Sequence, residues 1–253
     1  MIDFSLPPPA IIIPAPKLIV PDYPKLVVPA LGGSFAALLQ AKKAGGCGPV
    51  PIVKGSGGGA QTVAGGSTSH SIAIPGVRAS GDVLVACACH GSNSTSSWPA
   101  GWTSFLGTDN RISGAWRRSD GTETTVVMTT QQDEVAYFIL VVGCVSVAAT
   151  PIAGGFASGS GATADPPLLT PSWTTVPTLY IAVGVSIAVP SSVTGTPTGY
   201  TAGATFSDTS GANTPTIRWC QKDVNPGAAE NPSAYTCTSG NNRSATIGIR
   251  GLP

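Results

Sequence analysis

The sequence predicts an all-β protein: an antiparallel β-sandwich preceded by an extended proline-rich arm and one short helix. Three observations predict this class. Glycine (32) and proline (23) are abundant among the 253 residues, as expected when many turns join short strands. Apolar runs of strand length recur at short spacing after residue 69. Prolines are too dense in residues 7–29 for a helix.

The N-terminal arm, residues 1–33, repeats a short apolar triplet that ends at a proline. The triplets are Ile11, Ile12 and Ile13; Leu18, Ile19 and Val20; and Leu26, Val27 and Val28. Proline has no amide donor, so we do not expect this segment to form a central strand of a sheet in its own domain. The triplets are too apolar for a solvated linker, so we expect residues 7–31 to run along some 75 Å of a partner protein. A strand-like arm that packs on its own domain is the alternative.

A short helix and a glycine-rich hinge follow the arm. The helix is expected over residues 34–46, where Ser34 caps good helix formers and Gly45 and Gly46 end them. Residues 47–68 are glycine-rich and predict a flexible hinge. The β-sandwich domain is therefore expected over residues 69–253.

Strands are predicted wherever apolar runs lie between turn residues in this domain. The ranges are 71–74, 82–90, 111–117, 124–129, 136–147, 178–188, 216–222, 233–237 and 245–250. Many short strands at this spacing favour a sandwich or jelly roll.

A weak internal repeat suggests two related half-sandwiches. The stretch Pro99-Ala100-Gly101-Trp102-Thr103 is matched by Pro197-Thr198-Gly199-Tyr200-Thr201, and each is followed by an apolar strand that contains a tryptophan. We therefore predict that Trp116 and Trp219 are equivalent core positions. Two interleaving halves would assemble a double Greek key, as in a jelly roll.

Charge is sparse, which removes several classes of partner. Only 10 % of residues are charged and the net charge is +1, so no electrostatic case exists for nucleic acid or an anionic membrane. No apolar run reaches the roughly 18 residues of a membrane helix. The N-terminus lacks the pattern of a signal peptide. If the protein reaches the outside of a cell, we expect it to leave by lysis or as part of a particle.

Residues 69–251 resemble the β-sandwich domains of tailed-phage virion proteins, particularly tail-fibre and minor structural proteins. The resemblance is carried by Gly81-Asp82-Val83-Leu84-Val85-Ala86, Pro99-Ala100-Gly101-Trp102-Thr103, Ala115-Trp116-Arg117-Arg118 and Ala136-Tyr137-Phe138-Ile139-Leu140. It implies a lectin-like jelly roll attached to a virion and, often, recognition of a host surface. These are scaffold motifs, so no site residue follows from them.

The six cysteines leave several interpretations open. Cys87, Cys89 and His90 are the nearest approach to a metal motif, but the spacing is wrong for zinc, and strand alternation puts His90 on the opposite face from both cysteines. Buried core cysteines are the preferred interpretation. Cys220 and Cys237 flank a turn and form a candidate disulfide, with two free thiols as the alternative.

No catalytic, cofactor-binding or metal-binding set is predicted. There are two histidines and no nucleophile-elbow or phosphate-loop motif, and Asp133-Glu134 is expected in a solvated turn. The candidate recognition residues lie in two loops at matching places of the repeat: Asn93, Ser94 and Trp98, and Ser191 and Ser192. Trp98 could stack on a sugar, or could fold onto the edge of the sandwich.

The sequence therefore predicts a non-enzymatic structural protein of a phage virion. Its arm, residues 7–31, would bind other virion proteins, and its sandwich would project as a fibre, spike or decoration module, as a homo-oligomer and without a cofactor. One alternative is an adhesin module that binds a host-surface glycan. The other is a glycan hydrolase.

Overall fold

The computed structural model describes residues 47–61, 67–92, 95–106, 111–148, 150–173, 175–209 and 214–253. The predicted arm and helix, residues 1–46, lie outside these ranges. All regular structure within them is β-strand, which confirms the all-β class. The described residues contain no helix long and apolar enough to span a membrane.

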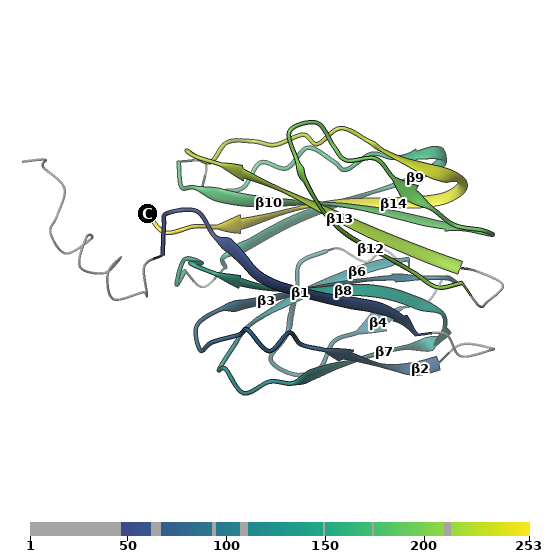
Figure 1. Cartoon of the computed structure of the whole chain (residues 1–253), viewed down its shortest axis with the longest axis horizontal. Helices are drawn as coiled ribbons and strands as arrows, with labels where there is room; N and C mark the ends of the chain where they lie inside the picture. The colour runs from purple at the N-terminus through teal and green to yellow at the C-terminus, as the bar shows by residue number, and fades with distance from the viewer. Residues whose placement is uncertain are drawn as a thin grey trace, which may run out of the picture.

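Three antiparallel sheets are stacked in layers (Figure 1). The first has the order β1-β8-β3-β6-β5, the second β11-β14-β10-β13-β12 with β9 also paired to β14, and the third β2-β7-β4. The strands are β1 Ile52–Gln61, β2 Ser67–Ala73, β3 Val83–His90, β4 Ser96–Ser97, β5 Thr103–Ser104, β6 Ile112–Arg118, β7 Thr125–Asp133, β8 Val135–Gly143, β9 Ile152–Ala164, β10 Thr178–Ala188, β11 Val193–Thr194, β12 Thr201–Ser207, β13 Thr214–Val224 and β14 Tyr235–Arg250.

The main core lies between the first and second sheets. Odd-numbered residues of β3, such as Val85, pack there against β10 and β14 residues such as Val183 and Ile247. Even-numbered residues of β3, such as Leu84, face the opposite way and pack on the third sheet. Because β3 is covered on both faces, all eight of its residues are buried, which explains its continuous apolar sequence.

The two halves of the chain have equivalent strand orders. The order β1-β8-β3-β6-β5 corresponds to β9-β14-β10-β13-β12, with matching order along the chain. Trp116 lies opposite Val85, and Trp219 lies opposite Val183 at the same place of the second sheet. The two Pro-x-Gly turns are also alike, since Gly101 and Gly199 have φ angles of 86° and 78°. The predicted repeat is therefore confirmed.

The halves do not interleave as predicted. Each half forms its own large sheet, and the two sheets meet face to face through the main core. In each sheet the hydrogen-bonded strands come from one half of the chain, so no double Greek key is shared by the halves.

Most of the glycine-rich segment is a strand, so the hinge predicted at 47–68 is wrong over residues 52–61, while residues 62–66 lie outside the described ranges. Residues 52–61 form β1, which pairs with β8 from Ile52↔Gly143 to Gln61↔Val135. A Cβ on Gly58 would lie 2.4 Å from the Phe206 ring, so glycine here makes room for an aromatic side chain. The sandwich therefore includes β1 and begins before residue 69.

A second glycine repeats this arrangement at the other edge. A Cβ on Gly154 of β9 would lie 2.7 Å from the Phe105 ring, just beyond β5. Each half thus places a phenylalanine over a glycine on the first strand of the other half. Edge strands without side chains at these points let the two sheets approach closely.

Gly58→Ala should lower the free energy of unfolding by about 1–3 kcal/mol, because the added methyl group overpacks against Phe206. Gly159→Ala on β9 is the matched control, since its Cβ meets nothing within 4 Å, and it should change stability by less than about 0.5 kcal/mol. Urea denaturation measures both. Equal costs would mean that β1 is not packed against Phe206.

The two repeat tryptophans should differ in their contribution to stability. Trp219 is 5 % exposed and contacts Phe138 at 6.1 Å between ring centroids, whereas Trp116 is half-buried. Trp219→Ala should cost about 3–5 kcal/mol and Trp116→Ala clearly less. Chemical denaturation of both variants measures this, and an equal or larger cost for Trp116 would contradict the burial difference.

Candidate functional site

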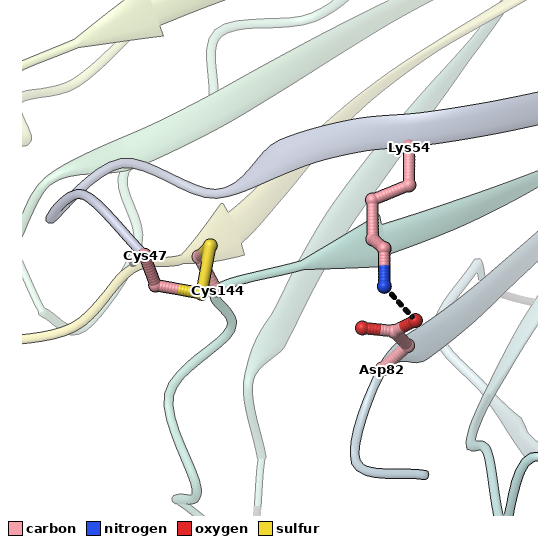
Figure 2. The surroundings of a disulfide bond; sticks show 4 residues. All are labelled: Cys47, Lys54, Asp82 and Cys144. Atoms are coloured by element: carbon pink, nitrogen blue, oxygen red, sulfur yellow. Dashed lines mark hydrogen bonds and ion pairs between the residues drawn. A yellow bond between two sulfur atoms is a disulfide. The ribbon is translucent and has the colours of Figure 1, made fainter. Parts of the chain in front are cut away.

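The chain enters the sandwich at a disulfide, and we define this arm root by Cys47, Cys144, Lys54 and Asp82 (Figure 2). Cys47 is joined to Cys144, which directly follows β8, with 5.3 Å between their Cα atoms and 97 residues of separation in sequence. The bond therefore ties the segment before β1 to the strand beside it. No local sequence pattern predicts this pair, because the two cysteines are 97 residues apart.

Cys144 has a left-handed backbone, with a φ of 60°, and no other non-glycine residue in the described ranges has a positive φ. This conformation costs a β-carbon residue roughly 1–2 kcal/mol. The next residue, Val145, is in the main core. The disulfide is thus held between a strand on one side and a core side chain on the other.

An ion pair crosses the sheet beside the disulfide. Lys54 Nζ of β1 lies 2.7 Å from Asp82 Oδ2, and that oxygen also accepts a 2.7 Å hydrogen bond from the Ala79 amide. The lysine crosses over β8 at Gly143, where a Cβ would lie 2.7 Å from Lys54 Cδ. Because Lys54 is 36 % exposed, water screens the pair, which contributes at most about 1 kcal/mol.

A cavity of about 700 Å³ opens between these groups. Its rim carries Val147, which is 89 % exposed, and Ile52, which is 52 % exposed. Arg118 donates hydrogen bonds to the Gly81 and Ser146 carbonyls at 3.0 and 2.7 Å, and burial lowers the pKa of its guanidinium. The walls combine apolar side chains with already paired charges, an arrangement that suits binding rather than proton transfer.

The C-terminus lies at the same end of the sandwich. The Leu252 amide donates to the Pro49 carbonyl at 3.0 Å, and the Gly251 amide donates to the Pro177 carbonyl at 2.7 Å. Both ends of the described chain therefore lie together at the arm root (Figure 1).

The two predicted recognition loops do not form one surface. Asn93 and Ser94 lie outside the described residues. Trp98 is half-buried and stacks on Trp102, with 5.7 Å between the ring centroids. Both rings pack on the cluster between the first and third sheets. Trp98 therefore folds onto the sandwich, as the alternative interpretation expected.

The second loop lies on the far face of the second sheet. The Ser191 and Ser192 hydroxyls bond Thr216 and Thr238 at 2.6 and 2.7 Å, and the loop continues to Val193 and Tyr200, which pack on that face. The large sheets meet through their inner faces, so loops at matching places of the repeat lie on opposite sides of the molecule.

The predicted Cys220–Cys237 disulfide is absent, and both thiols are free and buried. Cys220 lies on β13 and Cys237 on β14, and β10 lies between these strands. Cys220 lies opposite Ala182 of β10, whereas Cys237 lies opposite Val193 of β11, in the part of β14 before the stretch that pairs with β10, so the two cysteines are not cross-strand neighbours. Burial raises the pKa of Cys237 to about 11, so this thiol is protonated and unreactive at neutral pH.

Cys87 and Cys89 are also free and lie in the main core, on one face of β3 as alternation predicts. Burial raises the pKa of both thiols. Among the described residues, no three or more side chains that could ligate a metal lie together.

A buried polar cluster lies at the end of β3 that is farther from Asp82, and the sequence analysis did not predict it. His90 Nε2 lies 3.3 Å from Ser113 Oγ, and His90 Nδ1 lies 3.9 Å from Asp133 Oδ2. Asp133 Oδ1 accepts hydrogen bonds from the Ser92 and Glu134 amides at 2.9 and 2.8 Å. The Asp133-Glu134 turn is therefore buried, not solvated as predicted.

The residue types of this cluster match a nucleophilic triad, but the geometry does not. His90 has no exposed surface, and 3.9 Å is too long for a hydrogen bond to orient the imidazole. The cluster instead links the end of β3, the start of β6 and the end of β7.

Comparison of the chain with protein-family models, with curated proteins and with solved structures gives no match in any of the three.

Loss of the disulfide should destabilise the protein. Cys144→Ser should lower the free energy of unfolding by about 2–4 kcal/mol, because the bond closes a long loop of the unfolded chain. Thermal scans with and without a thiol reductant measure this. The reductant should lower the melting temperature of the wild type and leave that of the variant unchanged; a wild type that is insensitive to the reductant would contradict the bond.

Proposed function

We propose that this chain is a structural protein of a tailed-phage virion, anchored by its N-terminal arm and projecting its β-sandwich as a fibre, spike or decoration module. The observation that carries the proposal is the junction of arm and sandwich. An apolar, proline-punctuated segment leads to a disulfide that fixes its base to β8. A pull on the arm at Cys47 would be transmitted directly to the core, without a hinge.

The rest of the molecule agrees with a structural role. The buried thiols of Cys87, Cys89 and Cys237 have raised pKa values and are unreactive. The resemblance of residues 69–251 to phage sandwich domains supplies the virion context, and a jelly roll remains the finer description that it implies. Disulfides are rare in the bacterial cytoplasm, so the Cys47–Cys144 bond is expected to form after lysis.

A glycan-binding adhesin is the second candidate, and one groove favours it. This groove, of about 410 Å³, lies beside β9. Its lining combines apolar residues such as Pro167 and Leu168 with polar and charged ones: Ser158, Asp165, Asn231, Asn242, Arg243 and Ser244. Asn242 is fully buried and donates to the Gly161 and Thr163 carbonyls at 2.6 and 3.2 Å. Binding of the full chain to a glycan array without turnover would favour this candidate, and turnover would favour a hydrolase.

The arm should be needed for assembly and not for folding. Replacing Ile11, Ile12 and Ile13 together by serine should leave the melting temperature unchanged and abolish incorporation into particles, because it removes one apolar anchor. Incorporation is measured by quantifying the chain in purified particles.

The matched control replaces three exposed apolar residues of the sandwich by serine: Val77, Leu168 and Val189. This control should incorporate normally. Normal incorporation of the arm variant would overturn the proposed function.

A further inference from the structure

One strand edge of the sandwich lacks the usual protection against pairing. Native edge strands are kept short, bulged, charged or proline-bearing. β5 and β11 have two residues each, β12 has a bulge between Ala202 and Thr205, and β1 has a bulge after Val53 and carries Lys54. These edges are therefore poor templates for another strand.

β9 differs from them in every respect. It has 13 residues, Ile152–Ala164, without a charge or a proline, and it pairs with β14 in unbroken register from Ile152 to Gly161. Within the described residues β14 is its only strand partner. Residues 158–160 are exposed. β9 therefore presents a row of backbone donors and acceptors on its outer side.

The arm contains a window with complementary properties. Successive amides of a strand point to alternate sides in the plane of the sheet. In residues 10–20 the two prolines, Pro14 and Pro16, are both even-numbered. Every odd-numbered residue from Ile11 to Ile19 keeps its amide, so one side of the window can pair completely while the prolines face outward.

Prolines also limit the window at both ends, and its side chains are large and apolar. Pro9 and Pro21 are odd-numbered and would end the pairing on either side. The even-numbered side chains are all apolar, and β9 consists largely of glycine, serine and alanine, which offer little cross-strand contact of their own. Large aliphatic neighbours supply the contacts that such a strand lacks.

We infer that residues 10–20 of one copy pair as an edge strand with β9 of a second copy of this chain. The inference rests on the proposed assembly role of the arm and names its partner. Residues 21–46 can extend up to roughly 85 Å. In the same molecule, β9 begins close to the arm root. Ile152 lies opposite Ile249, and the nearby Leu252 amide donates a hydrogen bond to the Pro49 carbonyl. A connection of this length is long enough to reach β9 of a neighbouring molecule.

The parity of the prolines gives a sharp test on the full chain. Ile13→Pro removes a donor from the pairing side, whereas Ile12→Pro, the matched control, adds a proline on the outer side. Analytical ultracentrifugation should show that the wild type and Ile12→Pro self-associate, and that Ile13→Pro raises the dissociation constant about tenfold or more. Gly159→Lys on β9 should do the same, since its Cβ has open space and its charge blocks the edge.

Mixing the two defective variants decides which copy supplies the arm. Ile13→Pro retains an intact β9 and Gly159→Lys retains an intact arm, so an equimolar mixture should form a one-to-one complex that neither forms alone. Equal effects of Ile12→Pro and Ile13→Pro, a wild type that stays monomeric, or failure of the mixture would overturn the inference. Slow hydrogen exchange of the β9 amides in the dilute monomer would also overturn it, if Ile13→Pro abolished this protection. That result would mean that β9 pairs with the arm of its own chain. If these tests fail while the serine arm variant still fails to enter particles, the proposed function stands without this partner.

Discussion

The face-to-face packing of the two large sheets is the constraint on which the rest of the structure depends. It buries one face of β3 and one face of β10. The third sheet covers the other face of β3, and residues such as Val193 and Tyr235 cover that of β10, so both strands are apolar at nearly every position. It also sets the edges, where Phe206 lies over Gly58 and Phe105 lies over Gly154. A larger residue at either glycine would push the sheets apart, so glycine at these two positions is a packing requirement.

The two glycine-rich edge strands have different fates. β1 is secured at its start by the disulfide, by the Lys54–Asp82 pair and by a bulge. Within the described residues β9 has no disulfide or ion pair, and its start is held by pairing with β14, by Ile152 in the main core and by the hydrogen bond from the Arg250 amide to the Pro151 carbonyl. β9, the counterpart of β1 in the second half, is therefore left as an open edge. The arm that precedes β1 has prolines spaced so that one side of it could pair with this edge.

Sequence reasoning succeeded where burial dictates hydrophobicity and failed where packing dictates small residues. β10 was predicted with its observed bounds, 178–188, and the two tryptophans were paired correctly across the repeat. β1 and β9 were missed because glycine and serine carry no hydrophobic period. The Cys220–Cys237 pairing failed because strand order decides which cysteines are neighbours, and β10 lies between them. Order is a long-range property, and for the same reason the Cys47–Cys144 bond had no local signal.

The arm root explains how such a fold could work as a projecting module. Flexible attachment would let a sandwich of sparse surface charge sample many orientations on a particle. Here the attachment passes through a disulfide between β8 and the segment before β1, and the backbone turns at Cys144 to place Val145 in the core. The disulfide thus fixes where the chain leaves the sandwich, and residues 21–46 connect that point to the segment proposed to bind a neighbour. If that neighbour is a second copy paired at β9, the contact is heterologous, so it closes into a ring or continues as a filament according to the rotation between copies.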